Sequence, residues 1–290
     1  MKEILIIVSC VPLYVVNSFC DKYVSLKNGN KYNFLYNCIK FLIGSLCLML
    51  PFLLDSSPKF ALGVILCGVA CGVMYAISKT LMLKGYEKTS VAFMTLCHSS
   101  GMIIPCMIGH FFWSEELSLF SVIGIILAVT SIVMLKDSSS EKNRFDVVGI
   151  IIGLIIFLSS GGVMVVQKLM GIYFAEQSVG AYNFYSFLVP FFILSFFAYK
   201  GKGNDYKSDK KDIRSVLLCA LGSAVSLCVI SYVMTTLAGG VPSVILFPLF
   251  NGLGIISVCV GSVFVFKEKL TTKKIIGLII GICGLCLVNI

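Results

Sequence analysis

Charge is scarce in this sequence. Only 13% of its 290 residues are Asp, Glu, Lys or Arg, and 58% are hydrophobic, whereas a soluble domain carries about a quarter charged residues. The mean hydropathy is +0.98. These values exclude a soluble enzyme, a disordered chain and a nucleic-acid-binding domain. They predict an all-α polytopic membrane protein whose function lies within or between its helices.

The sequence also lacks the motifs of ATP hydrolysis and of intramembrane catalysis. It contains no Walker Gly-Lys-Ser/Thr, no His-Glu-x-x-His, no Gly-x-Ser-x-Gly and no paired aspartates inside an apolar run. Its 13 cysteines lie almost all in apolar runs, where a disulfide framework or a metal cluster is not expected. We therefore expect no enzymatic activity, no cofactor, no metal and no direct use of ATP.

Apolar segments of membrane-spanning length fill most of the chain. A transmembrane helix needs about 20 apolar residues, and ten segments meet this requirement: 3–21, 32–54, 59–83, 88–113, 117–136, 146–168, 178–200, 213–237, 240–266 and 270–290. The linker 137–145 falls near the midpoint. It divides the chain into a first repeat, 1–136, and a second, 146–290, of five segments each.

The two halves resemble one another. An ungapped shift of 153 residues aligns the last two segments of each half, and shifts of 146 and 150 align the first two. Because five is odd, the two halves have opposite orientations. The duplication predicts an inverted repeat, which is common among secondary transporters. The coinciding pairs include Lys22 with Lys168, Asn33 with Asn183, His98 with Asn251, Gly101 with Gly254, and Glu115 with Glu268.

Each half ends in an acid-x-Leu motif followed by a glycine-rich last segment, at Glu115-Glu116-Leu117 and Glu268-Lys269-Leu270. With the paired five-helix halves, this pattern resembles the EamA branch of the drug/metabolite transporter superfamily over nearly the whole chain. The resemblance implies ten helices around a central cavity and transport of small metabolites, amino acids or drugs. Small multidrug exporters of the superfamily use a membrane carboxylate for proton exchange. Here Asp21 is predicted at a segment end, which disfavours proton-driven drug export.

Basic residues alternate between loops. The odd-numbered loops hold 18 of the 23 Lys and Arg residues, whereas the N-terminus and even-numbered loops hold only Lys2, Lys59 and Lys168. The positive-inside rule then places the odd loops in the cytoplasm and both termini outside. Relatives in the resembled family are usually drawn with both termini inside, so the two arguments disagree. A missed or additional span near the N-terminus would reconcile them.

Few ionisable residues lie within the segments, where a charge usually faces a cavity or a partner. Lys40 shares one helix face with Asn33 and Asn37, a stripe suited to an anionic or carboxylate-bearing solute. Alternatively, Lys40 extends along its aliphatic stem to the membrane surface. His98 lies mid-segment, coincides with Asn251 and titrates near neutral pH. It is a candidate for substrate binding and for carrying a coupling proton, or else a neutral histidine that joins two helices.

Other polar residues are weaker candidates for the substrate site, because each could instead bridge helices. They are Tyr14, Asn17, Tyr75, Gln167 and Ser231. Lys79, near the end of its segment, is expected to reach the surface. Pro105 and Pro248 are expected to kink their helices. Small residues four apart in the last segment of each half, Gly124/Ala128 and Gly277/Gly281, predict close packing between the halves rather than dimerisation.

The sequence therefore predicts a secondary transporter that moves a small polar metabolite, such as an amino acid, across the cytoplasmic membrane by alternating access. Its expected partners are the small-molecule substrate and the lipid bilayer, without nucleic acid, and the chain is expected to act as a monomer or homodimer. The alternative is a non-transporting membrane receptor or assembly subunit.

Overall fold

Helices account for all regular secondary structure in the described part of the computed structural model, which comprises residues 2–28, 33–88, 91–116, 118–134, 147–200, 210–265 and 272–288. The linker 137–145 and Glu268 lie outside these residues. The helices are α1 (Lys2–Asn28), α2 (Asn33–Leu54), α3 (Leu62–Lys88), α4 (Val91–Ser100), α5 (Ile103–Trp113), α6 (Leu119–Met134), α7 (Val147–Tyr173), α8 (Val179–Lys200), α9 (Lys210–Ala238), α10 (Ser243–Val265) and α11 (Thr272–Val288).

Seven of these helices are long and apolar enough to cross a membrane: α1, α2, α3, α7, α8, α9 and α10. The helices α6 and α11 are shorter, with 16 and 17 residues. The fourth expected segment, 88–113, is not one helix, because it is divided into α4 and α5. The all-helical class is thus confirmed, whereas the number of ten spans is not.

Gly101 and Met102 separate α4 from α5 at a tight turn. The amide of Gly101 donates to the carbonyl of His98 at 3.3 Å. Pro105 lacks an N–H, and the carbonyl of Gly101 accepts instead from the amide of Ile104 at 3.1 Å. A Cβ atom on Gly101 would lie 2.8 Å from the backbone nitrogen of Gly161 in α7, so a side chain there would push the turn away. Pro248, also expected to kink its helix, lies in an uninterrupted α10.

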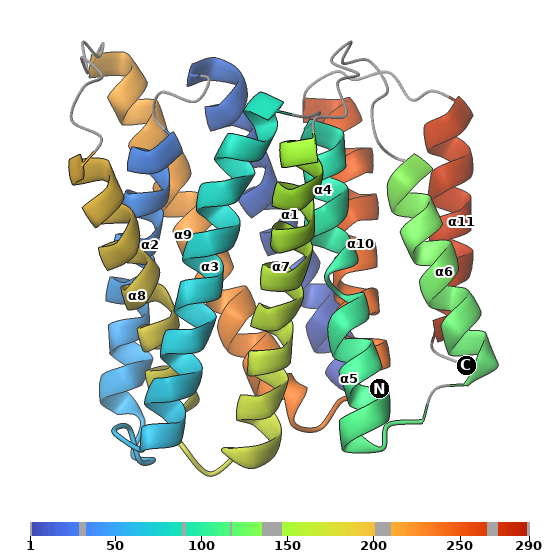
Figure 1. Cartoon of the computed structure of the whole chain (residues 1–290), viewed down its shortest axis with the longest axis horizontal. Helices are drawn as coiled ribbons and strands as arrows, with labels where there is room; N and C mark the ends of the chain where they lie inside the picture. The colour runs from blue at the N-terminus through green and yellow to red at the C-terminus, as the bar shows by residue number, and fades with distance from the viewer. Residues whose placement is uncertain are drawn as a thin grey trace.

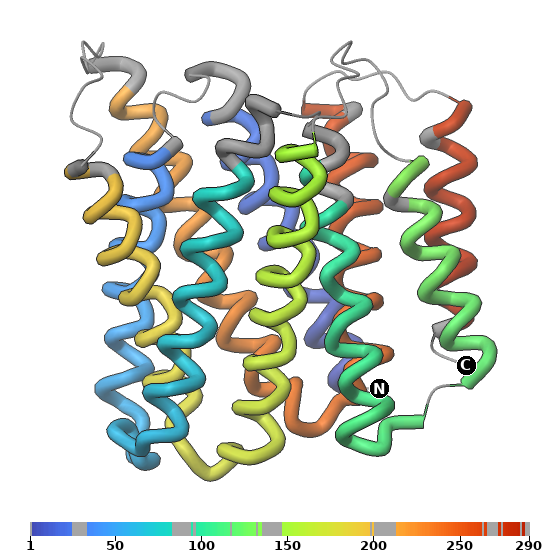
Figure 2. Tube along the Cα trace, viewed as in Figure 1, coloured from blue at the N-terminus to red at the C-terminus, as the bar shows by residue number. Residues whose placement is uncertain are grey.

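The two halves of the chain run through the bundle in opposite senses. Figure 1 shows α1 ascending and α7 descending, and α6 ascending and α11 descending. The beginning of α1 and the end of α11 lie towards the same face (Figure 2), which we call the terminal face. The helix ends that flank the basic odd-numbered loops lie at the opposite face, here called the loop face.

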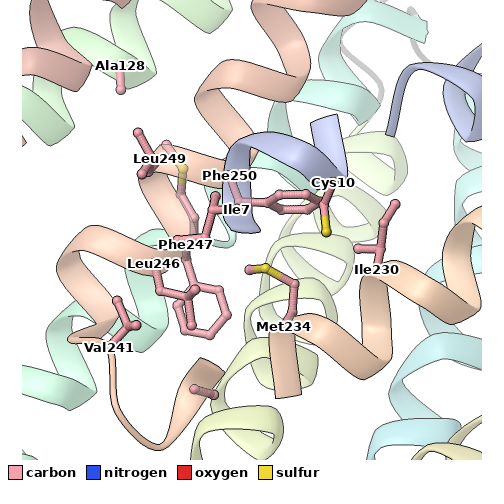
Figure 3. Packing of buried hydrophobic residues seen from close by; sticks show 12 residues of the cluster. Ile7, Cys10, Ala128, Ile230, Met234, Val241, Leu246, Phe247, Leu249 and Phe250 are labelled. Atoms are coloured by element: carbon pink, nitrogen blue, oxygen red, sulfur yellow. The ribbon is translucent and has the colours of Figure 1, made fainter. Parts of the chain in front are cut away.

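Each half packs into the other. The helix α1 lies against α9 and α10, α7 lies against α3 and α4, and α2 pairs with α8. The largest buried apolar cluster shows this exchange, because Ile7 and Cys10 of α1 meet Met234 of α9 and Phe250 of α10 (Figure 3). The halves therefore form one packed bundle around shared interfaces.

The helices α6 and α11 form a further pair between the halves. Ser131 Oγ of α6 donates to the carbonyl of Gly277 at 2.6 Å. A Cβ atom on Gly284 would lie 2.9 Å from the carbonyl oxygen of Gly124. Small residues at helical spacing thus allow close backbone approach between the halves, as the sequence pattern predicted.

Candidate functional site

An ion pair lies inside the bundle between α1, α2 and α9. Lys40 Nζ lies 3.0 Å from Asp21 Oδ1 and donates to Asn17 Oδ1 at 2.8 Å. The Lys40 side chain is 0% exposed and that of Asp21 is 33% exposed. Lys40 therefore does not reach the membrane surface. The structure brings together two residues that the sequence proposed, Asn17 and Lys40, and adds a carboxylate that it had placed elsewhere.

Asp21 was expected at the end of the first segment, and the apolar span does end close to it, at Val24, but the helix itself runs further. The helix α1 continues to Asn28, so Asp21 lies well within it. A charge there is tolerated because Lys40 neutralises it. The four-residue spacing of Asn17 and Asp21, which puts both on one helix face, was the signal in the sequence that could have indicated this.

Two hydroxyl groups complete what we call the charged cluster, which comprises Asn17, Asp21, Tyr36, Lys40 and Ser223. Tyr36 Oη donates to Asp21 Oδ1 at 2.5 Å. Ser223 Oγ of α9 donates to Asn17 Oδ1 at 2.6 Å and to Asp21 Oδ1 at 3.3 Å. Sequence reasoning identified neither hydroxyl, because only tertiary packing brings them to the ion pair.

A neutral polar cluster occupies the related position in the second half. Gln167 Nε2 of α7 lies 3.4 Å from Ser231 Oγ of α9, and Ser231 Oγ donates to Asn183 Oδ1 of α8 at 2.6 Å. The shift of 146 residues that aligns Lys22 with Lys168 also aligns Asp21 with Gln167. Gln167 and Ser231, both proposed from the sequence, therefore meet, but here they join helices. Of the two related clusters, only the first carries charge.

The remaining tyrosine and asparagine candidates lie on α1 (Tyr14), α2 (Asn37) and α3 (Tyr75). The Tyr14 ring packs edge-on against Phe250, with centroids 5.4 Å apart, and against Gly254. The Tyr75 ring lies 5.9 Å from that of Phe41. Both tyrosines are half-buried, whereas Asn37 is buried in α2. The side chain of Asn33, the third member of the expected stripe, is outside the described part.

His98 and Asn251 occupy different surroundings. His98 is half-buried in the last turn of α4, and its carbonyl accepts a hydrogen bond from Ser160 Oγ at 2.8 Å. Asn251 is buried, and its side chain donates to the carbonyl of Phe247 in its own helix at 2.9 Å. The described hydrogen bonds include none between His98 and Asn251.

Two further ionisable groups act on the charged cluster from the facing helices. Lys79 of α3 interacts electrostatically with Asp21 and Lys40. His98 of α4 interacts electrostatically with Asp21, Lys40 and Lys79. The charged cluster of α1, α2 and α9 is therefore within electrostatic range of two further ionisable groups, one on α3 and one on α4.

A second buried ion pair lies near the terminal face. Lys168 Nζ lies 2.8 Å from Glu115 Oε1, with side-chain exposures of 4% and 10%, and donates to the carbonyl of Val241 at 2.7 Å. The backbone amide of Ser243 donates to Glu115 Oε2 at 2.7 Å. The sequence assigned Lys168 to a loop, and this is wrong, because the residue lies inside α7. It was misplaced because its partners come from the segment that follows α5 and from the α9–α10 turn.

One turn further along α7, Gly171 touches the backbone of Gly239. A Cβ atom on Gly171 would lie 2.9 Å from the carbonyl carbon of Ala238. We call these residues with the second ion pair the terminal seal: Glu115, Lys168, Gly171, Gly239, Val241 and Ser243. The terminal seal packs α7 against α9, the first and third helices of the second half. The related helices of the first half, α1 and α3, do not pack against each other to a comparable extent.

A hollow of about 460 Å³ adjoins the terminal seal, lined by Gly171, Thr235 and Gly240 among others. Its described lining carries no charged side chain. This hollow therefore offers a charged solute no counter-charge among its described lining residues.

The carboxylate of Asp55 adds a link at the terminal face. It accepts hydrogen bonds from the amide of Ser57 at 3.0 Å and from Ser178 Oγ at 2.7 Å. These donors, chiefly the Ser57 amide, hold the pKa of Asp55 below its usual value. Because Ser178 Oγ also accepts from the amide of Ala181 at 3.0 Å, Asp55 connects the end of α2 to the beginning of α8.

Comparison with known proteins gives a consistent result. A family model described as "EamA-like transporter family" matches residues 1–136 and 147–290. No curated protein matches. A solved crystal structure, titled only "Crystal structure of protein", is 14% identical and covers 99% of this chain and 96% of its own, with a TM-score of 0.77. That likeness shows a shared fold.

Proposed function

The chain belongs to the EamA-like transporter family, and from this premise we propose that it is a secondary transporter of a small polar metabolite across the cytoplasmic membrane. The observation that carries the proposal is the ion pair of Asp21 and Lys40 inside the bundle, with Lys79 and His98 acting on it from α3 and α4. Charge at this depth is costly and typically marks a solute pathway.

Ten spans in two inverted repeats fit the arrangement of the helices. Figure 1 shows α4 and α5 continuing one another from end to end, so together they serve as one span. From Val91 to Trp113 their combined length is about 34 Å at 1.5 Å per residue, enough to cross the hydrocarbon core. The repeats are then 1–136 and 146–290, each with five spans. Broken helices at the repeat interface typically mark the substrate site of such transporters.

Alternating access is supported by the difference between the two ends of the bundle. At the terminal face, α7 and α9 are joined through Gly171 and Gly239, beside the ion pair of Glu115 and Lys168. The related helices α1 and α3 are packed less closely. A transporter that is closed at one face has this kind of asymmetry between its equivalent halves. If α7 and α9 separated while α1 and α3 came together, the terminal face would open.

We propose that the loop face is cytoplasmic, because its loops hold 18 of the 23 basic residues. Both termini are then outside, and a tag fused to Met1 or to Ile290 is expected to be cleaved when protease is added to intact spheroplasts. A cytoplasmic reporter protein serves as the control for leakage. Protection of both tags until the membrane is lysed would reverse the orientation.

Solute counterflow in proteoliposomes tests the transport function. Pools of amino acids, nucleosides, sugar phosphates and quaternary amines are offered in turn, and protein-free liposomes give the background. We expect saturable exchange with the amino acid pool. If no pool exchanges while the reconstituted protein unfolds cooperatively on heating, a receptor or assembly subunit becomes the better description.

His98→Ala and Asn251→Ala are each expected to lower the counterflow rate about tenfold, the effect of losing roughly one hydrogen bond to the solute. The amount of protein in the membrane is expected to stay unchanged. Thr130→Ala is the matched control, because Thr130 bonds only to the carbonyl of Ile126 in its own helix, at 2.8 Å, and is exposed. If both variants retain full exchange, these two residues are not part of the site.

A further inference from the structure

The two partners of the interior ion pair differ in how they can meet a solute. Lys40 has three protons, and its three acceptors are Asn17 Oδ1 at 2.8 Å and the two Asp21 oxygens at 3.0 and 3.3 Å. Its ammonium group is thus saturated, and its side chain is fully buried. Lys40 therefore cannot bind an anion in this arrangement.

Asp21 has spare capacity on one oxygen. Within the described part of the chain, its Oδ1 accepts from Tyr36 and Lys40 and lies 3.3 Å from Ser223 Oγ, whereas Oδ2 has Lys40 at 3.3 Å as its one partner. A carboxylate oxygen can accept two hydrogen bonds, and one third of the Asp21 side chain is exposed. The reachable member of the pair is therefore an acceptor with negative charge.

We infer that Asp21 Oδ2 binds a protonated amine of the transported solute and that Lys40 is the fixed counter-ion that orients the Asp21 carboxylate. The inference rests on the proposed transport function and names the chemistry of its solute. An ammonium group donates charge-assisted hydrogen bonds to a carboxylate. Because Lys40 remains on Oδ1, the solute adds to the pair and does not have to break it.

The facing helices indicate the second charged group of the solute. Lys79 of α3 adds a positive charge within electrostatic range of Asp21 and Lys40. A solute with an amine alone would raise the positive charge of this interior, which is unfavourable at low dielectric. A carboxylate on the same molecule, facing Lys79, keeps the charge balanced. The solute class that fits is a small zwitterion with a primary amine.

Competition assays in proteoliposomes and binding assays on the detergent-solubilised protein test this inference. The probe is the amino acid pool, and the competitors are the matching 2-hydroxy acids, which lack the amine, and the matching primary amines, which lack the carboxylate. Each set is also tested for thermal stabilisation of the detergent-solubilised protein, which requires binding but not transport. We expect 2-hydroxy acids to bind at least tenfold more weakly than amino acids, and we expect primary amines to fall between them.

The informative variant is Asp21→Asn combined with Lys40→Met, since it removes both partners of the ion pair together and leaves the net charge of the interior unchanged. We expect the double variant to lose the preference for amino acids over 2-hydroxy acids, whereas Lys59→Met retains it. Three results would overturn the inference. They are equal binding of amino acids and 2-hydroxy acids to the wild-type protein, no thermal stabilisation by any amine, and a double variant that still prefers amino acids to 2-hydroxy acids. If amino acids stabilise the protein against heat but no counterflow is seen, the proposed transport function is wrong and the amine-binding site is retained.

Discussion

Glu115→Gln is expected to destabilise the protein by about 3–5 kcal/mol, the cost of removing one partner of a buried ion pair. The glutamine can still accept the hydrogen bond from the Ser243 amide, so α10 keeps its first donor satisfied. Lys168, however, retains only the carbonyl of Val241 in a site where its side chain is 4% exposed. Thermal unfolding in detergent measures the loss.

Lys168→Met is expected to cost less than Glu115→Gln. The Glu115 carboxylate keeps the amide of Ser243, the first residue of α10, and a negative charge at a helix N-terminus is stabilised by up to about 2 kcal/mol. The double variant Glu115→Gln/Lys168→Met is expected to recover most of the loss. Glu176→Gln, an exposed position in the α7–α8 turn, is the control and is expected to stay within about 0.5 kcal/mol.

The order of the two single variants is the decisive observation. If Lys168→Met is the more damaging change, the carboxylate is not stabilised by α10 and the electrostatic description of the terminal seal is wrong. If neither change affects stability, the pair does not hold α5, α7 and α10 together. Counterflow by the double variant then shows whether the terminal face must close for transport to occur.

The sequence predicted the fold well because membrane helices are specified by local composition. Apolar length and the basic loops between the segments locate the helices without reference to tertiary contacts. The EamA resemblance is confirmed by the match over both halves. The division of the fourth segment was harder to foresee, because it depends on Gly101 meeting Gly161 of α7, a contact that no property of that segment alone contains.

The site was predicted only in part, and for a physical reason. A charged residue near a segment end looks like a boundary, so Asp21 was assigned to a segment end and Lys168 to a loop. In the structure each lies inside its helix because a distant part of the chain supplies the opposite charge, Lys40 of α2 for Asp21 and Glu115 after α5 for Lys168. Pairing between distant parts of the chain cannot be read from hydropathy. The roles of His98 and Asn251 in substrate binding remain predictions for the transport assay.

Asp21→Asn is expected to destabilise the protein more than Lys40→Met does, although Lys40 is the more deeply buried partner. Removing the carboxylate leaves an ammonium group with no exposure and with only neutral acceptors, which costs about 3–5 kcal/mol. Removing the lysine leaves a carboxylate that keeps Tyr36 and Ser223 as donors and remains 33% exposed. Hydration through that exposed side reduces the penalty of the unpaired charge.

A double-mutant cycle measures this coupling. The combined variant Asp21→Asn/Lys40→Met is expected to be more stable than Asp21→Asn alone, with a coupling energy of about 2 kcal/mol or more for residues in direct contact. Lys59→Met is the control, because Lys59 lies outside the helices and donates to the carbonyl of Leu53 at 2.9 Å. Additive single effects would show that the pair is not coupled. Since Asp21 is proposed to bind the solute amine and Lys40 to orient it, a large coupling energy would also explain why the Asp21 carboxylate is held in position before the solute arrives.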